Sequence, residues 1–256
     1  MFVDTHAHLY AEQFNEDRDA MLERAKSARI EKVYLPAIDQ ETHDAMLDLE
    51  ANSQGYCEAM MGLHPVSVKA DVETELGIVE KWLGERPFCA IGEIGIDLYW
   101  DKTYFEEQKM AFKRQIDWAR SLKKPFVIHS RDSTQIIIDI LKKEQDGNLK
   151  GIFHCFTGTK QEAAQIMDLG FLMGIGGVVT FKNGGLDKTV VDIPLEHLVL
   201  ETDAPYLTPT PFRGKRNETA YIEIIAKKLA ETKAIELESL AEITTRNAYE
   251  LFDPGG

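Results

Sequence analysis

Short apolar segments alternate with longer segments of helical periodicity along the whole sequence, and this alternation limits the possible folds more than any other feature. It is typical of parallel strands joined by crossover helices. Eight such units in 256 residues favour one α/β domain, a (β/α)8 TIM barrel spanning residues 1–256. An open doubly wound sheet would give the same alternation and is the alternative fold. The expected strands are Phe2–Leu9, Lys32–Ile38, Tyr56–Leu63, Phe88–Ile94, Pro125–His129, Gly151–Cys155, Phe171–Ile175 and His197–Glu201.

The segments between these strands carry apolar residues at helical spacing. We expect Asp132 and Ser133 to cap the helix that contains Ile136 and Leu141, because short polar side chains accept hydrogen bonds from the first amides of a helix. The other expected helices include Asp17–Ala28, Tyr104–Leu122, Thr219–Ala230 and Ile235–Phe252.

Polar residues recur at the carboxyl ends of the expected strands, where barrels of this type place their reacting groups. Five of the 7 histidines lie at such ends. His43 lies in a polar helix, where we expect a solvated side chain, and His197 lies at the amino end of a strand, so neither receives a role. The strand-end residues are His6, His8, His64, Glu93, Asp97, His129, Arg131, His154, Glu201 and Asp203.

The nature of these residues indicates a metal centre. His6 and His8 share one face of an extended strand, because alternate side chains point the same way, and two imidazoles suit half of a divalent-metal site. Glu93 stands among small and apolar neighbours, where an ionised carboxylate needs a cation. A metal supplies that cation better than the alternative, an ion pair with an arginine. Four histidines and two carboxylates exceed one tetrahedral site and fit two metals that share a carboxylate.

The composition argues against several classes of protein. A net charge of -14 disfavours a broad, sequence-independent grip on nucleic acid, although a local basic patch or a bound metal could hold a few phosphates. Cys57, Cys89 and Cys155 are widely spaced, so we expect no disulfide framework and a reducing, cytoplasmic location. Cys155 is expected to point away from His154 as a packed thiol. We expect no signal segment and no membrane contact, because no apolar run approaches the roughly 20 residues of a membrane span.

Several motifs, taken in order along the chain, resemble a known signature. They are Asp4–Leu9, the Gly-Glu-Ile-Gly-Ile-Asp run Gly92–Asp97, His129–Arg131, His154–Phe156 with Gly158, and Glu201–Pro205. Together they are similar to the signature of the TatD-type metal-dependent hydrolases, often called TatD DNases. The similarity spans essentially the whole chain, and the combination is specific although each motif alone is not. Phe212–Glu218 also resembles the loop of that family after the last strand, where the family continues with proline and this chain has Thr219.

The resemblance implies two divalent metal ions, Mg, Mn or Zn. Family members are commonly described as deoxyribonucleases that trim DNA from the 3′ end, so it also implies a DNA substrate, single-stranded or at 3′ ends. The implied ligands are His6, His8, Glu93 and Asp203 for one ion, and Glu93, His129 and His154 for the other.

We expect Asp203 and Glu93 to carry catalysis in a two-metal hydrolysis of a phosphodiester. A carboxylate after the last strand can touch both a metal and a water, so Asp203 is expected to orient the attacking water and take its proton. Glu201 shares the strand face of Asp203 and is expected either to orient a ligand histidine or to support a metal.

Three residues are expected to face a substrate phosphate: His64, Arg131 and Arg213. Arg213 belongs with Lys215 and Arg216 to a compact basic cluster, which eases the objection raised by the net charge. Two other roles stay open, since His64 could cap its loop and Arg131 could pair with an acid.

Other functions also fit metal ligands on a barrel, because such ligands do not specify a substrate. One alternative is an amidohydrolase or esterase that cleaves a cyclic amide, a lactone or an aminoacyl-tRNA ester. A lysine at the bridging position would favour it, whereas this chain has Glu93. The alternative outside enzymes is a metal-binding scaffold, which would normally lack a ligand. The sequence leaves the oligomeric state open, from a monomer upward.

Overall fold

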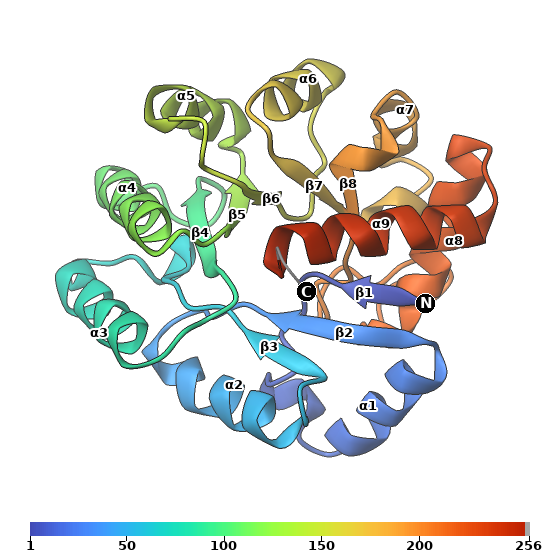
Figure 1. The fold of residues 1–256 in the computed structure, drawn as a ribbon, viewed down its shortest axis with the longest axis horizontal. Helices are drawn as coiled ribbons and strands as arrows, with labels where there is room; N and C mark the ends of the chain where they lie inside the picture. The colour runs from blue at the N-terminus through green and yellow to red at the C-terminus, as the bar shows by residue number, and fades with distance from the viewer. Residues whose placement is uncertain (254–256) are drawn as a thin grey trace.

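The computed structural model describes residues 1–253, and residues 254–256 of the expected domain lie outside the described residues. Parallel strands form a ring, and helices surround it (Figure 1). The strands are β1 (Phe2–Asp4), β2 (Ile30–Leu35), β3 (Cys57–Ala59), β4 (Ile91–Asp97), β5 (Phe126–Arg131), β6 (Gly151–Phe153), β7 (Leu172–Ile175) and β8 (Leu198–Leu200).

The ring consists of two hydrogen-bonded parallel sheets, β1-β2-β3 and β4-β5-β6-β7-β8, each in sequence order. Backbone hydrogen bonds join the two sheets at both seams. The Gly92 amide donates to the Met61 carbonyl at 3.0 Å, and the Thr5 amide donates to the Leu200 carbonyl at 3.0 Å. These contacts complete the ring of a (β/α)8 barrel, so the alternative of an open sheet is wrong.

The expected helices are present, with small shifts at their ends. Ser133 takes the N-cap position of α5, but its hydroxyl donates to the Ile96 carbonyl at 2.6 Å and makes no capping bond. The expected cap is therefore wrong, because a contact with β4 uses the hydroxyl. No helix within residues 1–253 is long and apolar enough to cross a membrane. The helices are α1 (Arg18–Ser27), α2 (Gln40–Asn52), α3 (Val72–Glu85), α4 (Phe105–Leu122), α5 (Thr134–Glu144), α6 (Lys160–Asp168), α7 (Leu186–Val190), α8 (Ile222–Lys233) and α9 (Leu237–Phe252).

Strand β1 is shorter than the sequence predicts, which changes how the first histidines are held. It ends at Asp4 rather than at Leu9. Beyond it the His6 carbonyl accepts from the Asp203 amide at 2.9 Å, and the His8 amide donates to the Ala204 carbonyl at 2.7 Å. The two histidines converge as expected, and backbone hydrogen bonds to the loop after β8 hold them in place of a longer regular strand.

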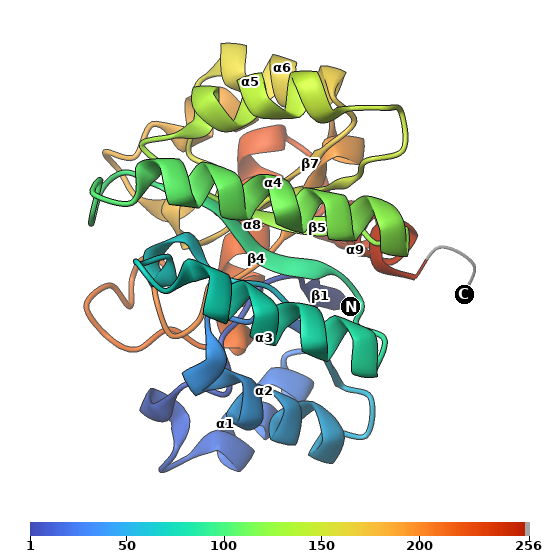
Figure 2. The ribbon, with the colours of Figure 1, turned by 90° about the vertical axis from the view of Figure 1, so that its left-hand side faces the viewer.

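Helix α9 covers the amino end of the barrel, next to β1 and β8, whereas helices such as α3, α4 and α5 lie along its outside (Figures 1 and 2). Its Phe252 ring stacks on Tyr34 with centroids 3.9 Å apart. Val3, Met60 and other buried apolar side chains pack in the same cluster. These apolar side chains fill the interior at this end of the barrel.

Candidate metal centre

The six residues expected to bind metal meet at the carboxyl end of the barrel. Five of them are at most 9% exposed, and His129 is partly buried. They come from five strands or the loops that follow them: His6 and His8 after β1, Glu93 in β4, His129 in β5, His154 after β6 and Asp203 after β8.

The first group consists of His6, His8, Glu93 and Asp203. His6 Nε2 lies 3.3 Å from His8 Nε2 and 3.2 Å from Glu93 Oε2. Asp203 Oδ1 lies 3.7 Å from His6 Nε2 and 3.6 Å from His8 Nε2. Two atoms bound at about 2.1 Å to one tetrahedral ion lie about 3.4 Å apart, so the spacing of this group is that of a metal site.

The second group uses the other oxygen of Glu93. Its Oε1 lies 2.7 Å from His154 Nε2 and 2.9 Å from His129 Nδ1. Those two nitrogens are 3.4 Å apart. Oε1 and Oε2 of Glu93 therefore face different groups of nitrogen atoms.

A hydrogen bond outside the cluster determines which nitrogen of His8 faces it. Tyr10 donates its hydroxyl proton to the Pro36 carbonyl at 2.6 Å, so Tyr10 Oη accepts from His8 Nδ1 at 2.9 Å. Burial and the neighbouring His6 hold the pKa of His8 well below its ordinary value, so the ring is neutral. His8 Nε2 therefore presents a lone pair to the carboxylates of the first group.

His64 has the opposite arrangement. Its Nδ1 accepts a hydrogen bond from the Val66 amide at 3.0 Å, and burial lowers its pKa, so the neutral ring carries its proton on Nε2. That nitrogen lies 3.5 Å from Glu93 Oε1 and 3.2 Å from His129 Nδ1. His64 thus caps its loop and also presents a donor to the cluster.

A divalent cation fits the first group for an electrostatic reason. The lone pair of His8 Nε2 lies 3.7 Å from Glu93 Oε2 and 3.6 Å from Asp203 Oδ1. Such acceptors repel one another unless a proton or a cation lies between them. Imidazole and carboxylate ligands suit zinc, and the carboxylates also suit magnesium and manganese.

The environment of the two carboxylates separates their proton affinities. Burial raises the pKa of Glu93, but the imidazoles of His154 and His6 outweigh burial and hold it well below its ordinary value. Burial raises the pKa of Asp203 to about 6, against the opposing effect of His154 and His6. In the metal-free protein Asp203 is therefore the carboxylate of the two that binds a proton more readily.

Comparison with known proteins identifies the family of the chain. The chain matches a family model described as "TatD related DNase" over residues 3–253. It belongs to the TatD family. It is 40% identical over 253 residues to the uncharacterized metal-dependent hydrolase YabD of Bacillus subtilis, a match that covers 98% of this chain and 99% of YabD. The uncharacterized metal-dependent hydrolase YcfH of Escherichia coli is 32% identical, with 98% and 95% of the two chains covered.

A solved structure of the TatD family has the same fold. The TatD homolog YjjV of Escherichia coli matches with a TM-score of 0.93 at 30% identity, over 98% of each chain. This agreement confirms the expected TatD barrel. The chain is thus a member of a family of metal-dependent hydrolases.

In this TatD-family chain two further carboxylates contact His129 and His154 on the ring nitrogens that point away from Glu93. Asp97 Oδ2 lies 2.8 Å from His129 Nε2, which donates to it when Nδ1 faces the cluster. Glu201 Oε1 lies 3.5 Å from His154 Nδ1 and accepts from the Cys155 amide at 2.5 Å. The position of Glu201 fits the first of its two expected roles, orienting a ligand histidine. The sequence placed Asp97 at a strand end without a role, and only the pairing of β4 with β5 shows its partner.

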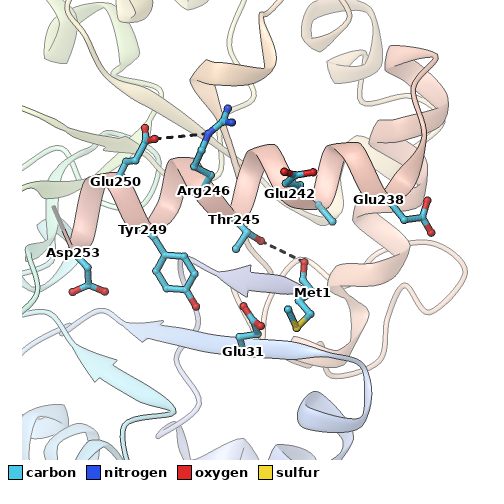
Figure 3. Close-up of a pocket in the computed structure, with 10 residues that line it drawn as sticks. Met1, Glu31, Glu238, Glu242, Thr245, Arg246, Tyr249, Glu250 and Asp253 are labelled. Atoms are coloured by element: carbon cyan, nitrogen blue, oxygen red, sulfur yellow. Dashed lines mark hydrogen bonds and ion pairs between the residues drawn. The ribbon is translucent and has the colours of Figure 1, made fainter. Parts of the chain in front are cut away.

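All the candidate metal ligands except His6 line a cavity of about 550 Å³, whose wall also includes Trp100, Arg131 and Tyr206. A larger cavity, about 740 Å³, lies at the amino end beside α9 (Figure 3). None of the six candidate ligands lines this cavity, so we place the functional site at the smaller one. The charged residues of the larger cavity are Glu31, Glu238, Glu242, Arg246, Glu250 and Asp253.

The arginines expected to meet phosphate differ in position. Arg131 is exposed on the cavity wall, and no carboxylate within residues 1–253 lies at ion-pair distance from it. Arg213 is exposed, stacks on the Phe181 ring at 3.8 Å and does not line that cavity. Arg216 donates to both oxygens of Asp17 at 2.6 and 2.9 Å. The expectation that Arg216 belongs to a basic cluster available to phosphate is therefore wrong, because Asp17 already pairs with its charge.

Two other expectations from the sequence are wrong. His43 lies in a helix as expected, but it is 2% exposed, because it shares the buried face of α2 with Met46. Cys155 lines the cavity instead of packing away from it, since β6 already ends at Phe153. Burial raises the pKa of the Cys155 thiol well above its ordinary value, so a thiolate nucleophile stays disfavoured. His197 lies at the amino end of β8, as expected.

Proposed function

We propose that this TatD-family protein is a divalent-metal-dependent deoxyribonuclease that removes nucleotides from 3′ ends of single-stranded DNA. The two-sided placement of Glu93 carries the proposal, because its oxygens face two separate sets of nitrogen atoms. Paired cations stabilise both the attacking and the leaving oxygen of a phosphodiester. The family description supports DNA as the polymer.

Two ions, Mg, Mn or Zn, would occupy the two groups. When bound, they would lower the pKa of a water toward about 7 and offset the charge of the phosphate oxygens. In this assignment His6, His8, Glu93 and Asp203 would hold one ion, and Glu93, His129 and His154 would hold the other.

The protein's own groups then position the substrate and move the proton. Asp203, whose Oδ1 lies 3.7 Å from His6 Nε2 and 3.6 Å from His8 Nε2, orients the attacking water and accepts its proton. His64 donates from Nε2 to a phosphate oxygen beside the cluster, because its other nitrogen is occupied by the Val66 amide. The guanidinium of Arg131, which has no acidic partner among residues 1–253, binds a phosphate on the cavity wall.

The test is a cleavage assay with single-stranded DNA labelled at either end, duplex DNA, an aminoacyl ester and a cyclic amide, each with and without a chelator. We expect shortening from the 3′ end of the single strand, lost with chelator and restored by a divalent ion. Asp203→Asn should abolish turnover while the circular dichroism spectrum is unchanged. His197→Gln, a histidine change at the opposite end of the barrel, should stay active.

A different result would contradict each part of the proposal: the metal centre, the substrate and the polarity. Cleavage that resists the chelator, or full activity of Asp203→Asn, would show that this centre does not carry the reaction. Hydrolysis of the ester or the amide without any cleavage of DNA would overturn the substrate assignment. Shortening from the 5′ end would overturn the polarity alone.

A further inference from the structure

Two aromatic side chains next to the metal cluster are unusually exposed. Tyr99 is 54% and Trp100 67% exposed, although large aromatic side chains are normally well covered. Both lie in the loop after β4, the strand that carries Glu93. Trp100 lines the same cavity as Glu93 and His129. A substrate held at the cluster would therefore lie against the indole.

The loop fixes the backbone of both aromatic residues. Asp97 Oδ1 accepts hydrogen bonds from the Tyr99 amide at 2.9 Å and from the Trp100 amide at 3.1 Å. The two rings meet edge to face, with centroids 5.0 Å apart. A surface that is ordered before binding loses little conformational entropy when a ligand stacks on it.

Arg131 adds a positive charge to this surface. Its guanidinium carbon lies 3.8 Å from the centre of the Tyr99 ring and 5.5 Å from that of Trp100. The register of β4 and β5 pairs Arg131 with Asp97, so the charge and the rings come from adjacent strands. A flat apolar face beside a guanidinium that forms no ion pair within the described part of the chain matches a nucleotide, which joins a flat base to an anionic phosphate.

We propose that Trp100, supported by Tyr99 and Arg131, stacks on the unpaired nucleobase next to the scissile phosphate. This inference rests on the proposed nuclease function and makes it more specific. A base inside a duplex already has both faces stacked on its neighbours, so the indole selects an unpaired end. Every base has a flat face, so this contact favours single strands without selecting sequence.

The test measures affinity for a short single-stranded oligonucleotide with a dye at its 5′ end, by fluorescence anisotropy, in the Asp203→Asn background with magnesium. A second oligonucleotide lacks the bases of its last two 3′ nucleotides. On the intact strand we expect Trp100→Ala to weaken binding by roughly fivefold to 150-fold, the range for loss of one stacked base. Trp100→Phe, which keeps a flat ring, should stay within about threefold of its parent.

The oligonucleotide without terminal bases is the decisive control. If Trp100 contacts the base, Trp100→Ala and its parent should bind this strand equally. An equal loss on both strands, or no loss on either, would overturn the proposal. A change of oligomeric state in Trp100→Ala, with DNA affinity unchanged, would also overturn it and assign the aromatic pair to a contact between copies.

Tryptophan fluorescence gives an independent measurement. The chain has 3 tryptophans, and the other two, Trp82 and Trp118, lie in α3 and α4 and pack against the core. Quenching by the intact strand should therefore be present with Trp100 and largely absent in Trp100→Phe. If the protein with wild-type Asp203 cleaves DNA but this difference is missing, the stacking proposal fails and the nuclease proposal stands. If that protein neither binds nor cleaves DNA, both fail.

Discussion

Replacing Asp97 with asparagine tests the support of the second metal group with a change of almost no volume. Asp97 Oδ2 lies 2.8 Å from His129 Nε2, while Oδ1 accepts from the amides of Tyr99 and Trp100. Burial raises the pKa of Asp97, but the hydrogen bonds from His129 and the Trp100 amide outweigh burial and lower it to about 2. The residue is therefore ionised at neutral pH. An asparagine has one acceptor oxygen in place of two, so in either orientation a donor loses its partner.

The expected magnitude follows from the bond that is lost. A hydrogen bond to a charged group contributes about 1.5–3 kcal/mol, which corresponds to about 10-fold to 150-fold in a binding constant. Groups that orient metal-binding histidines typically affect metal affinity by about 10-fold to 100-fold. We therefore expect Asp97→Asn to lower the affinity for one of the two ions by about 10-fold to 100-fold, because His129 is no longer oriented. The melting temperature should also fall by a few degrees.

Isothermal titration with zinc or manganese measures this effect without any substrate. Asp101→Asn is the matched control, because Asp101 lies in the same loop but contacts Lys69 at 3.2 Å and the Thr103 amide at 2.8 Å. The control should bind both ions like the wild type. Wild-type affinity for both ions in Asp97→Asn would refute the argument that Asp97 orients His129. An equal loss in Asp101→Asn would attribute the effect to the loop as a whole.

Three further predictions concern packing and charge. Gly174→Ala should lower both the melting temperature and activity, because the added Cβ would overlap Glu201 Oε2; unchanged values would show that Glu201 can move freely. Gly84→Ala in α3 meets no atom within 4 Å and should raise the free energy of unfolding by about 0.5–1 kcal/mol in chemical denaturation; a decrease would contradict this. Arg131→Ala should weaken DNA binding and reduce its salt dependence, whereas Arg216→Ala should change neither, because Arg216 is already ion-paired; equal effects in a salt titration would contradict the distinction.

Much of the fold was predictable because it depends on local patterns. Apolar segments and helical spacing identify the units of a barrel, and parallel strands bring their carboxyl ends to one face. That rule alone placed His154 and Asp203 near Glu93, although long stretches of chain separate them. It did not place His43, because the spacing of α2 does not show which face the neighbouring elements cover.

The sequence by itself determined the kind of barrel, the family and the set of side chains that gather at its open end, since periodicity and strand order are properties of the chain. Only the tertiary structure decided what those side chains present. Tyr10 turns the lone pair of His8 inward, Asp97 holds His129, and Asp17 neutralises Arg216. These outcomes depend on hydrogen bonds and ion pairs that act over a few ångströms. Which atoms come that close is settled by the packing of loops, and no local pattern in the sequence records it.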